Sequence, residues 1–183
     1  MKKVVLSEIS LIHGSVDLPK GYEINREKIK NDIITSFVNK KRINKNPKAY
    51  SYEDYEVSFS KPLQWFKDYI RDNIRLEHGF TLIEKSHHGN VLHPKEQSFL
   101  RYNIDPVDLR NSPDYTLIYA LDCAKESCEL IIEYDDNRRK NRTWHLPMLN
   151  NHFYMFPATQ KYMLTKNKSE KLNTILTITY EYI

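Results

Sequence analysis

The feature that most constrains this chain is a change of hydrophobic pattern at Gly79. Before it, apolar residues recur at helical spacing; after it come short runs rich in β-branched and aromatic residues, separated by polar turns. Eight such runs in about a hundred residues are typical of a closed barrel or jelly roll. They cover residues 80–83, 98–104, 115–121, 128–134, 143–146, 152–156, 161–165 and 173–182.

Two helices are expected ahead of these strands. Asn25 is suited to cap the first, whose apolar stripe contains Ile29, Ile33 and Phe37. Ser60 is suited to cap the second, which ends at Gly79. Its apolar face consists of Leu63, Phe66, Ile70 and Ile74. A strand over residues 3–12, ending at Gly14, is expected before both helices.

The predicted fold class is mainly β with flanking helices (α+β). Its architecture is a double-stranded β-helix, the jelly roll of cupin-like proteins, with the two N-terminal helices packed outside. With 183 residues the chain suits a single domain. Residues 1–79 provide the strand and the two helices, and residues 80–183 the double-stranded β-helix core.

Composition narrows the function classes. The net charge of +4 is a mild surplus, and the basic run at residues 40–48 adjoins Asn and Pro, which indicates an exposed loop and not a nucleic-acid groove. No stretch reaches the roughly 20 apolar residues of a membrane span. Cys123 and Cys128 flank an expected hairpin turn and are too few for a disulfide framework or a four-thiolate metal site. A reducing cytoplasm suits such a chain.

Three segments together resemble the 2-oxoglutarate and iron(II) dependent oxygenases. Residues 115–136 are similar to the central hairpin of that superfamily, residues 152–158 to the strand before the last metal ligand, and residues 171–177 to the strand after it. The resemblance covers residues 80–183 and is nearest to prolyl-hydroxylase-like, phage-type oxygenases. It implies a barrel that holds iron(II) through a His-x-Asp pair and a second His, with an arginine for 2-oxoglutarate.

The residues at those positions depart from the pattern. The resemblance puts Asn103 and Asp105 on the His-x-Asp pair and Tyr162 on the last ligand. Leu172 or Asn173 then stands in place of the arginine, and Tyr119 is a third vestigial cosubstrate position. An amide is a weak ligand for iron, and a phenol must lose a proton before it binds metal well. Only Asp105 keeps the expected chemistry.

A histidine-based metal site is the alternative. His88 and His93, from the segment 86–93, could join His145 around one ion. Gly89, Asn90 and Pro94 instead indicate an exposed loop there, which favours solvated imidazoles over a metal centre.

The leading hypothesis is an oxygenase-like protein that has lost catalysis. It would need no cofactor and would bind other protein chains, as an oligomer or as a phage-type virion neck, tail or assembly component. It would reside in the host cytoplasm or the virion, with neither membrane nor nucleic acid as partner. The alternative is an active 2-oxoglutarate/Fe(II) dependent oxygenase with non-standard ligands. The third hypothesis is a metal-free, cupin-like binder of small molecules.

Overall fold

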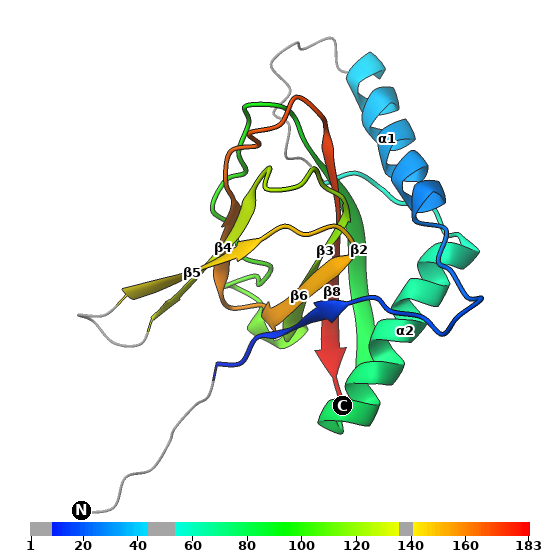
Figure 1. Cartoon of the computed structure of the whole chain (residues 1–183). Helices are drawn as coiled ribbons and strands as arrows, with labels where there is room; N and C mark the ends of the chain where they lie inside the picture. Colours follow the sequence, from blue (N-terminus) through cyan, green and yellow to red (C-terminus); the bar gives the residue numbers. More distant parts are fainter. Residues whose placement is uncertain (1–8, 44–53, 136–140) are drawn as a thin grey trace, which may run out of the picture.

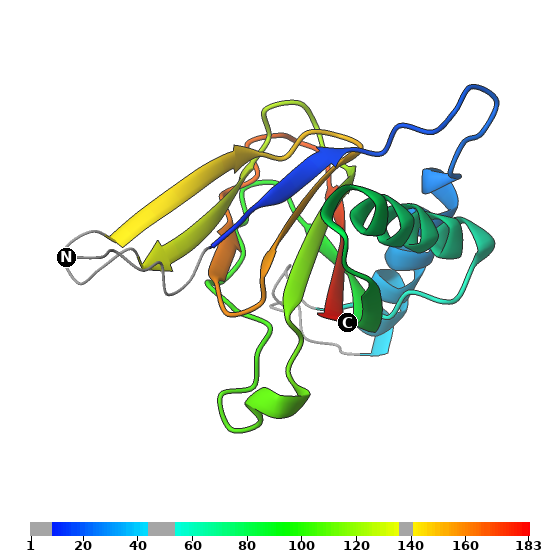
Figure 2. The same ribbon diagram turned by 90° about the horizontal axis from the view of Figure 1, so that it is seen from below.

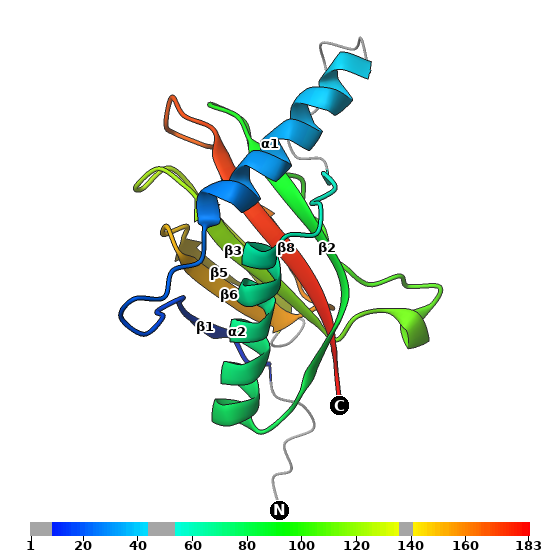
Figure 3. The ribbon, with the colours of Figure 1, turned by 90° about the vertical axis from the view of Figure 1, so that its right-hand side faces the viewer.

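A large sheet covered by two helices on one face and by a smaller sheet on the other forms the molecule. This computed structural model describes residues 9–43, 54–135 and 141–183. Both helices lie on the same side of the large sheet, as Figures 1 and 3 show. The result is mostly β with two helices packed outside, as the sequence predicts, and it is jelly-roll-like in its pairing of two sheets.

The large sheet has five strands in the order β1-β6-β3-β8-β2, and the small sheet has three in the order β5-β4-β7. All the strand pairings within the described residues are antiparallel. The strands are β1 (Ile12–Ser15), β2 (Leu82–Leu92), β3 (Tyr115–Asp122), β4 (Glu129–Asp135), β5 (Asn141–Pro147), β6 (His152–Pro157), β7 (Lys161–Leu164) and β8 (Asn173–Tyr182). The hairpin of β4 and β5 extends beyond the rest of the barrel (Figure 2).

Both helices have the caps and the buried apolar faces that the sequence predicts. In α1 (Arg26–Ile43) the Asn25 side chain accepts a hydrogen bond from the Lys28 amide at 3.0 Å. In α2 (Lys61–His78) the Ser60 side chain caps the first turn, and Gly79 ends the helix in the left-handed conformation with φ 78°. The predicted apolar stripes are buried: Ile29, Ile33, Phe37, Leu63, Phe66, Ile70 and Ile74. No helix in the described part of the chain is long and apolar enough to cross a membrane.

Side chains alternate between two cores along the central strands. On β3, Leu117, Tyr119 and Leu121 pack toward the helices. Ile118 and Ala120 pack between the two sheets instead. This alternation follows from the two-residue period of a strand, and it leaves both faces of the large sheet buried.

Four predicted elements differ from the structure. The histidine segment 86–93 is not a loop, because β2 continues through it to Leu92 and pairs with β8 along its length. Gly89 occurs in mid-strand because α1 approaches closely there, and Asn90 because it faces a polar barrel interior. Within the described residues the N-terminal strand spans Ile12–Ser15, one residue past the predicted end at Gly14. The predicted part over residues 3–8 lies outside the described residues.

The predicted strand at residues 98–104 is instead an extended segment beside β7. Ser98 donates its amide to the Leu164 carbonyl, and Arg101 and Tyr162 exchange both backbone hydrogen bonds. Three residues on this side match two on β7, so a bulge interrupts the ladder. The predicted basic loop at residues 40–48 also differs, because α1 continues to Ile43 and residues 44–48 lie outside the described residues.

Replacing Gly89 with alanine should weaken the contact between α1 and β2. A Cβ at this position would lie 2.4 Å from Cγ1 of Ile33. We expect a loss of about 1–3 kcal/mol in the free energy of unfolding, measured with urea, because a packed core tolerates added volume poorly.

Gly14→Ala is the matched control, since its Cβ would meet the Phe153 ring at an ordinary 3.5 Å. The second variant Ile33→Ala should remove most of the cost of Gly89→Ala in a double-mutant cycle. Equal effects of the two glycine substitutions would contradict this account of the helix contact.

Candidate functional site

The inner face of the large sheet carries several buried polar side chains. Thr116, Thr177 and Thr179 are almost fully buried there, and so is Asn90 of β2. Thr177 donates its hydroxyl to the Asn90 side-chain oxygen at 2.8 Å. Buried polar groups of this kind need partners. We call the site that these residues form with their partners the mouth of the barrel.

Asn103 and Tyr162 meet at this mouth. The Asn103 side-chain nitrogen donates to the Tyr162 hydroxyl oxygen at 3.2 Å and to the Thr116 hydroxyl at 2.9 Å. Burial raises the pKa of the Tyr162 phenol, although the nearby Arg101 charge acts in the opposite direction. Two residues at the presumed metal positions therefore lie in direct contact, and the phenol keeps its proton at neutral pH.

Asp105 does not join them through any contact in the described residues. Its side chain is exposed and accepts a hydrogen bond from the Val107 amide at 2.9 Å. Its own amide donates to the Ser112 hydroxyl at 2.7 Å. The carboxylate therefore stabilises its own loop.

An ion-pair cluster centred on Asp54 completes the mouth. Arg101 makes a two-pronged contact with the Asp54 carboxylate, at 2.9 and 3.1 Å. The His88 ring nitrogen lies 3.0 Å from the same carboxylate, and the Asn90 amide donates to it at 3.0 Å. Arg101 also lies over the Tyr162 ring, 6.0 Å from its centroid. The Asp54 cluster and the Asn103–Tyr162 pair thus form one network.

Sequence reasoning missed Asp54 and Arg101. Asp54 lies in a segment without regular periodicity, and 47 residues separate it from Arg101. The only available signal was the place of Arg101, two residues before Asn103 in the segment assigned to the barrel.

The three presumed cosubstrate positions lie elsewhere. Leu172 is at the surface. Asn173 is fully buried, and its side chain binds the turn between β3 and β4 through Ser127 at 2.8 Å. Tyr119 packs on the helix side of β3, where its hydroxyl donates to Asn151 at 2.8 Å. Burial raises the pKa of Tyr119 to about 12.

The three histidines of the alternative metal site are dispersed. His88 contacts Asp54, and the His93 ring packs on Phe37 with ring centroids 5.2 Å apart. His145, on β5 of the other sheet, pairs with Glu129 at 3.1 Å. Among the described residues, no group of three or more His, Cys, Asp or Glu side chains is arranged to hold a metal ion.

The donors at the mouth do not fit ferrous iron. The Asn103 nitrogen donates to two hydroxyls, the Tyr162 phenol is protonated, and the Asp105 carboxylate belongs to a separate loop. Iron(II) in this type of site takes imidazole and carboxylate ligands. What the arrangement can do is stabilise a polar barrel interior without a metal.

Comparison with known proteins gives the same fold. No family model matches the sequence, and no curated protein matches it. The crystal structure of the viral collagen prolyl hydroxylase of Paramecium Bursaria Chlorella virus-1 matches with a TM-score of 0.60 and 12% identity, covering 93% of this chain and 94% of that one. The chain has the fold of the 2-oxoglutarate and iron(II) oxygenases.

Two further structures support this oxygenase fold. The carbocyclase SnoK from nogalamycin biosynthesis has a TM-score of 0.63 at 11% identity, covering 94% of this chain and 79% of that one. A Pseudomonas putida prolyl-4-hydroxylase has a TM-score of 0.56 at 10% identity, covering 93% and 91%. At such identities the likeness concerns the fold, and the activity must be argued from the site.

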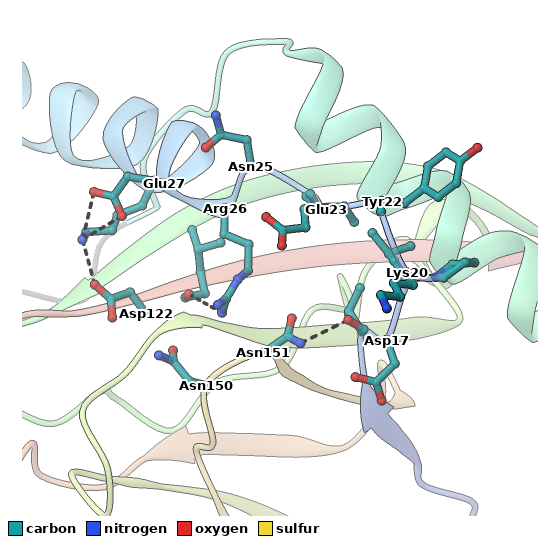
Figure 4. A pocket seen from close by; sticks show the side chains of 17 residues that line it. Asp17, Lys20, Tyr22, Glu23, Asn25, Arg26, Glu27, Asp122, Asn150 and Asn151 are labelled. Atoms are coloured by element: carbon teal, nitrogen blue, oxygen red, sulfur yellow. Dashed lines mark hydrogen bonds and ion pairs between the residues drawn. The ribbon is translucent and has the colours of Figure 1, made fainter.

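A cleft lies where β3 ends, beside Leu121 and Asp122. It is an open cleft of about 930 Å³ between the segment 16–25, the start of α1 and the turn that carries Asn150 and Asn151 (Figure 4). Lys30 bridges Glu27 at 3.2 Å and Asp122 at 2.8 Å across its edge. Arg26 reaches the Leu121 carbonyl at 3.4 Å. Acidic and basic groups are mixed there, so the lining favours no single ligand charge.

Replacing Asp54 with asparagine should destabilise the protein in a pH-dependent way. Its side chain is 48% exposed, so we discount the cost of breaking a buried pair to about 1–2 kcal/mol at neutral pH. Burial raises the pKa of Asp54, but hydrogen bonds from His88 and Arg101 outweigh it and hold the folded-state pKa below the usual range.

On acidification, the Asp54 carboxylate is therefore protonated at a higher pH in the unfolded chain than in the folded one. The contribution of the Asp54 ion pair to the free energy of unfolding is complete above about pH 4 and declines as the pH falls toward the folded-state pKa. Urea unfolding at several pH values should show the wild-type advantage over Asp54→Asn shrinking in acid. Asp105→Asn, which keeps an acceptor for the Val107 amide, is the control. A difference that stays constant with pH would refute the ion-pair assignment.

Proposed function

We propose that this chain is a non-catalytic module with the oxygenase fold that binds other protein chains. The absence of catalysis is supported by the hydrogen bond between Asn103 and Tyr162, which joins two presumed metal positions to each other. The partly exposed Asp54–Arg101 ion pair beside them balances its own charge with the protein's own side chains. A polar interior satisfied in this way needs neither iron nor 2-oxoglutarate.

We infer that the two sheets are the halves of a double-stranded β-helix. The support is the segment 98–103, which runs along β7 and would be the fourth strand of the small sheet. In this arrangement Asn103 and Tyr162 come from neighbouring strands at one end of the barrel.

Iron binding tests the non-catalytic proposal. We expect the purified protein, handled anaerobically, to bind iron(II) no better than background and to form no succinate from 2-oxoglutarate. The double variant Asn103→His, Tyr162→His should bind iron(II) at least about tenfold more tightly, because imidazole is a far better ligand than an amide or a protonated phenol.

The matched control is Tyr102→His with Asn111→His, which makes the same two substitutions at exposed positions. It should leave iron affinity unchanged. Stoichiometric iron in the wild-type protein together with succinate formation would establish the active-oxygenase alternative instead.

The protein-binding part rests on the long connection between β2 and β3. Its distal portion, with the short helix η1 (Leu109–Asn111), extends away from the barrel in Figures 2 and 3. Val107 is 94% exposed there and Leu109 61%. Apolar side chains on a projecting loop suit a protein interface. A phage-type virion or assembly partner stays a prediction from the sequence resemblance.

Self-association through this loop can be measured by sedimentation equilibrium. We expect concentration-dependent oligomers that the double variant Val107→Asp, Leu109→Asp dissociates, because a charged loop resists desolvation. At a concentration low enough for the wild type to be monomeric, the two proteins should unfold at the same midpoint. Leu76→Asp on α2, also exposed, is the control and should leave association intact. A wild-type monomer at all concentrations would count against this surface as a self-association site.

A further inference from the structure

Four side-chain nitrogen atoms at the mouth converge on one carboxylate. The Arg101 guanidinium donates to both oxygens of Asp54, at 2.9 and 3.1 Å. The Asn90 side-chain nitrogen donates to one of these oxygens at 3.0 Å, and the His88 ring nitrogen lies 3.0 Å from the same oxygen. A planar guanidinium fork with further nitrogens beside it matches the shape and the charge of a carboxylate.

The barrel holds these nitrogen atoms in position. Asn90 is fully buried, and the Thr177 hydroxyl of β8 donates to its side-chain oxygen at 2.8 Å. Because that bond uses the oxygen end of the amide, the nitrogen end is presented to Asp54. The Arg101 backbone exchanges two hydrogen bonds with Tyr162 of β7, and its guanidinium lies over the same tyrosine ring. The nitrogens are therefore fixed by the strands of the barrel.

The carboxylate comes from outside the barrel. Asp54 belongs to the connection between α1 and α2, which runs beside β2, where the Tyr55 and Gly89 backbones exchange two hydrogen bonds of 2.8 Å (Figure 3). The Asp54 side chain is 48% exposed, whereas the side chains of Arg101 and His88 are 24% and 15% exposed. The carboxylate is thus the part of this cluster that a dissolved ligand can most readily replace.

The surroundings of Asp54 also favour the ionised form of a carboxyl group. Burial raises the pKa of Asp54, but hydrogen bonds from His88 and Arg101 lower it by more. A carboxylate that took the place of Asp54 would meet the same nitrogens and keep its negative charge at neutral pH.

We propose that the mouth is a binding site for a small free carboxylate and that Asp54 occupies this site as an internal competitor. A ligand of the size of acetate carries the same two oxygens and the same charge as the Asp54 side chain. It therefore accepts the same hydrogen bonds from Arg101 and Asn90, and the exchange leaves the charge of the site unchanged. The contact between Asp54 and Arg101 is then autoinhibitory, because it lowers the affinity of the site for the ligand.

Removing the Asp54 side chain should open the site. The side chain that Asp54→Gly deletes has the size and charge of acetate, so added acetate can restore its contacts. We expect acetate to bind this variant saturably and to shift the NMR signals of the Asn90 side-chain amide and the Arg101 Nε–H group. Half-saturation of the wild type should need at least about tenfold more acetate, because Asp54 competes from within the same chain.

Three controls define the site. Sodium chloride at the same ionic strength corrects for charge screening. Asp105→Gly removes an exposed carboxylate that accepts the Val107 amide, and it should leave the acetate response as in the wild type. Adding Arg101→Lys to Asp54→Gly keeps the positive charge but loses the planar fork, so acetate should bind at least about tenfold more weakly.

Acetate that shifts the two signals of Asp54→Gly no more than chloride does would overturn the proposal, since the mouth would then close without Asp54. Equal half-saturation of this variant and the wild type would overturn it too, because Asp54 would not compete. If Asp54→Gly does not fold, the wild type decides. A saturable response of both signals to acetate supports the proposal, and a response equal to that of chloride overturns it.

The proposal is separate from the loss of catalysis and from protein binding. The acetate titration contains neither iron nor a partner chain, so its outcome does not depend on either. The mouth also differs from the presumed cosubstrate positions Leu172, Asn173 and Tyr119, none of which contacts Asp54 in the described part of the chain.

Discussion

Both faces of the large sheet are buried, so every polar side chain on its inner face must find a partner inside the molecule. An unpaired buried hydroxyl or amide costs on the order of 1–3 kcal/mol, a large share of the stability of a domain this size. Asn90, Thr116 and Thr177 all meet this requirement through side-chain hydrogen bonds. The Asp54–Arg101 ion pair and the Asn103–Tyr162 hydrogen bond are parts of that solution.

The same requirement explains the chemistry at the presumed iron position. In an oxygenase a metal ion and its ligands would satisfy the polar groups of this interior. Here Asn103 uses its two amide hydrogens on Thr116 and Tyr162, and Arg101 covers the phenol ring. Each substitution taken alone would leave a partner unsatisfied, but together they form a closed set. Conversion of this site back to metal binding therefore requires at least two simultaneous changes.

Signals from residues close together in the sequence predicted most of the fold. Caps at Asn25 and Ser60 and the apolar stripes located both helices, because helix ends and faces depend on residues a few positions apart. Gly89 and Asn90 wrongly indicated a loop, because the residues that explain their place in β2 are far away in the sequence. Gly89 makes room for Ile33 of α1, and Asn90 accepts a hydrogen bond from Thr177. The family resemblance, and not periodicity, placed Asn103 and Tyr162 at neighbouring positions of one site. The Asp54–Arg101 pair has no counterpart in periodicity or spacing, so sequence reasoning could not find it.

The polar side chains at the two ends of the barrel have different kinds of partner. At the mouth, charged and amide side chains are one another's partners, so a substitution there removes a partner and lowers the free energy of unfolding. At the far end, Asn173 stands at a position that resemblance assigns to the cosubstrate, yet its amide donates to Ser127 and to the Cys128 sulfur. The neutral side chain at this position therefore serves partners within the chain, in the turn between β3 and β4. The position that the resemblance assigns to the cosubstrate thus holds the turn between the two sheets in place, while Asn173 keeps its pairing with Leu92 of β2.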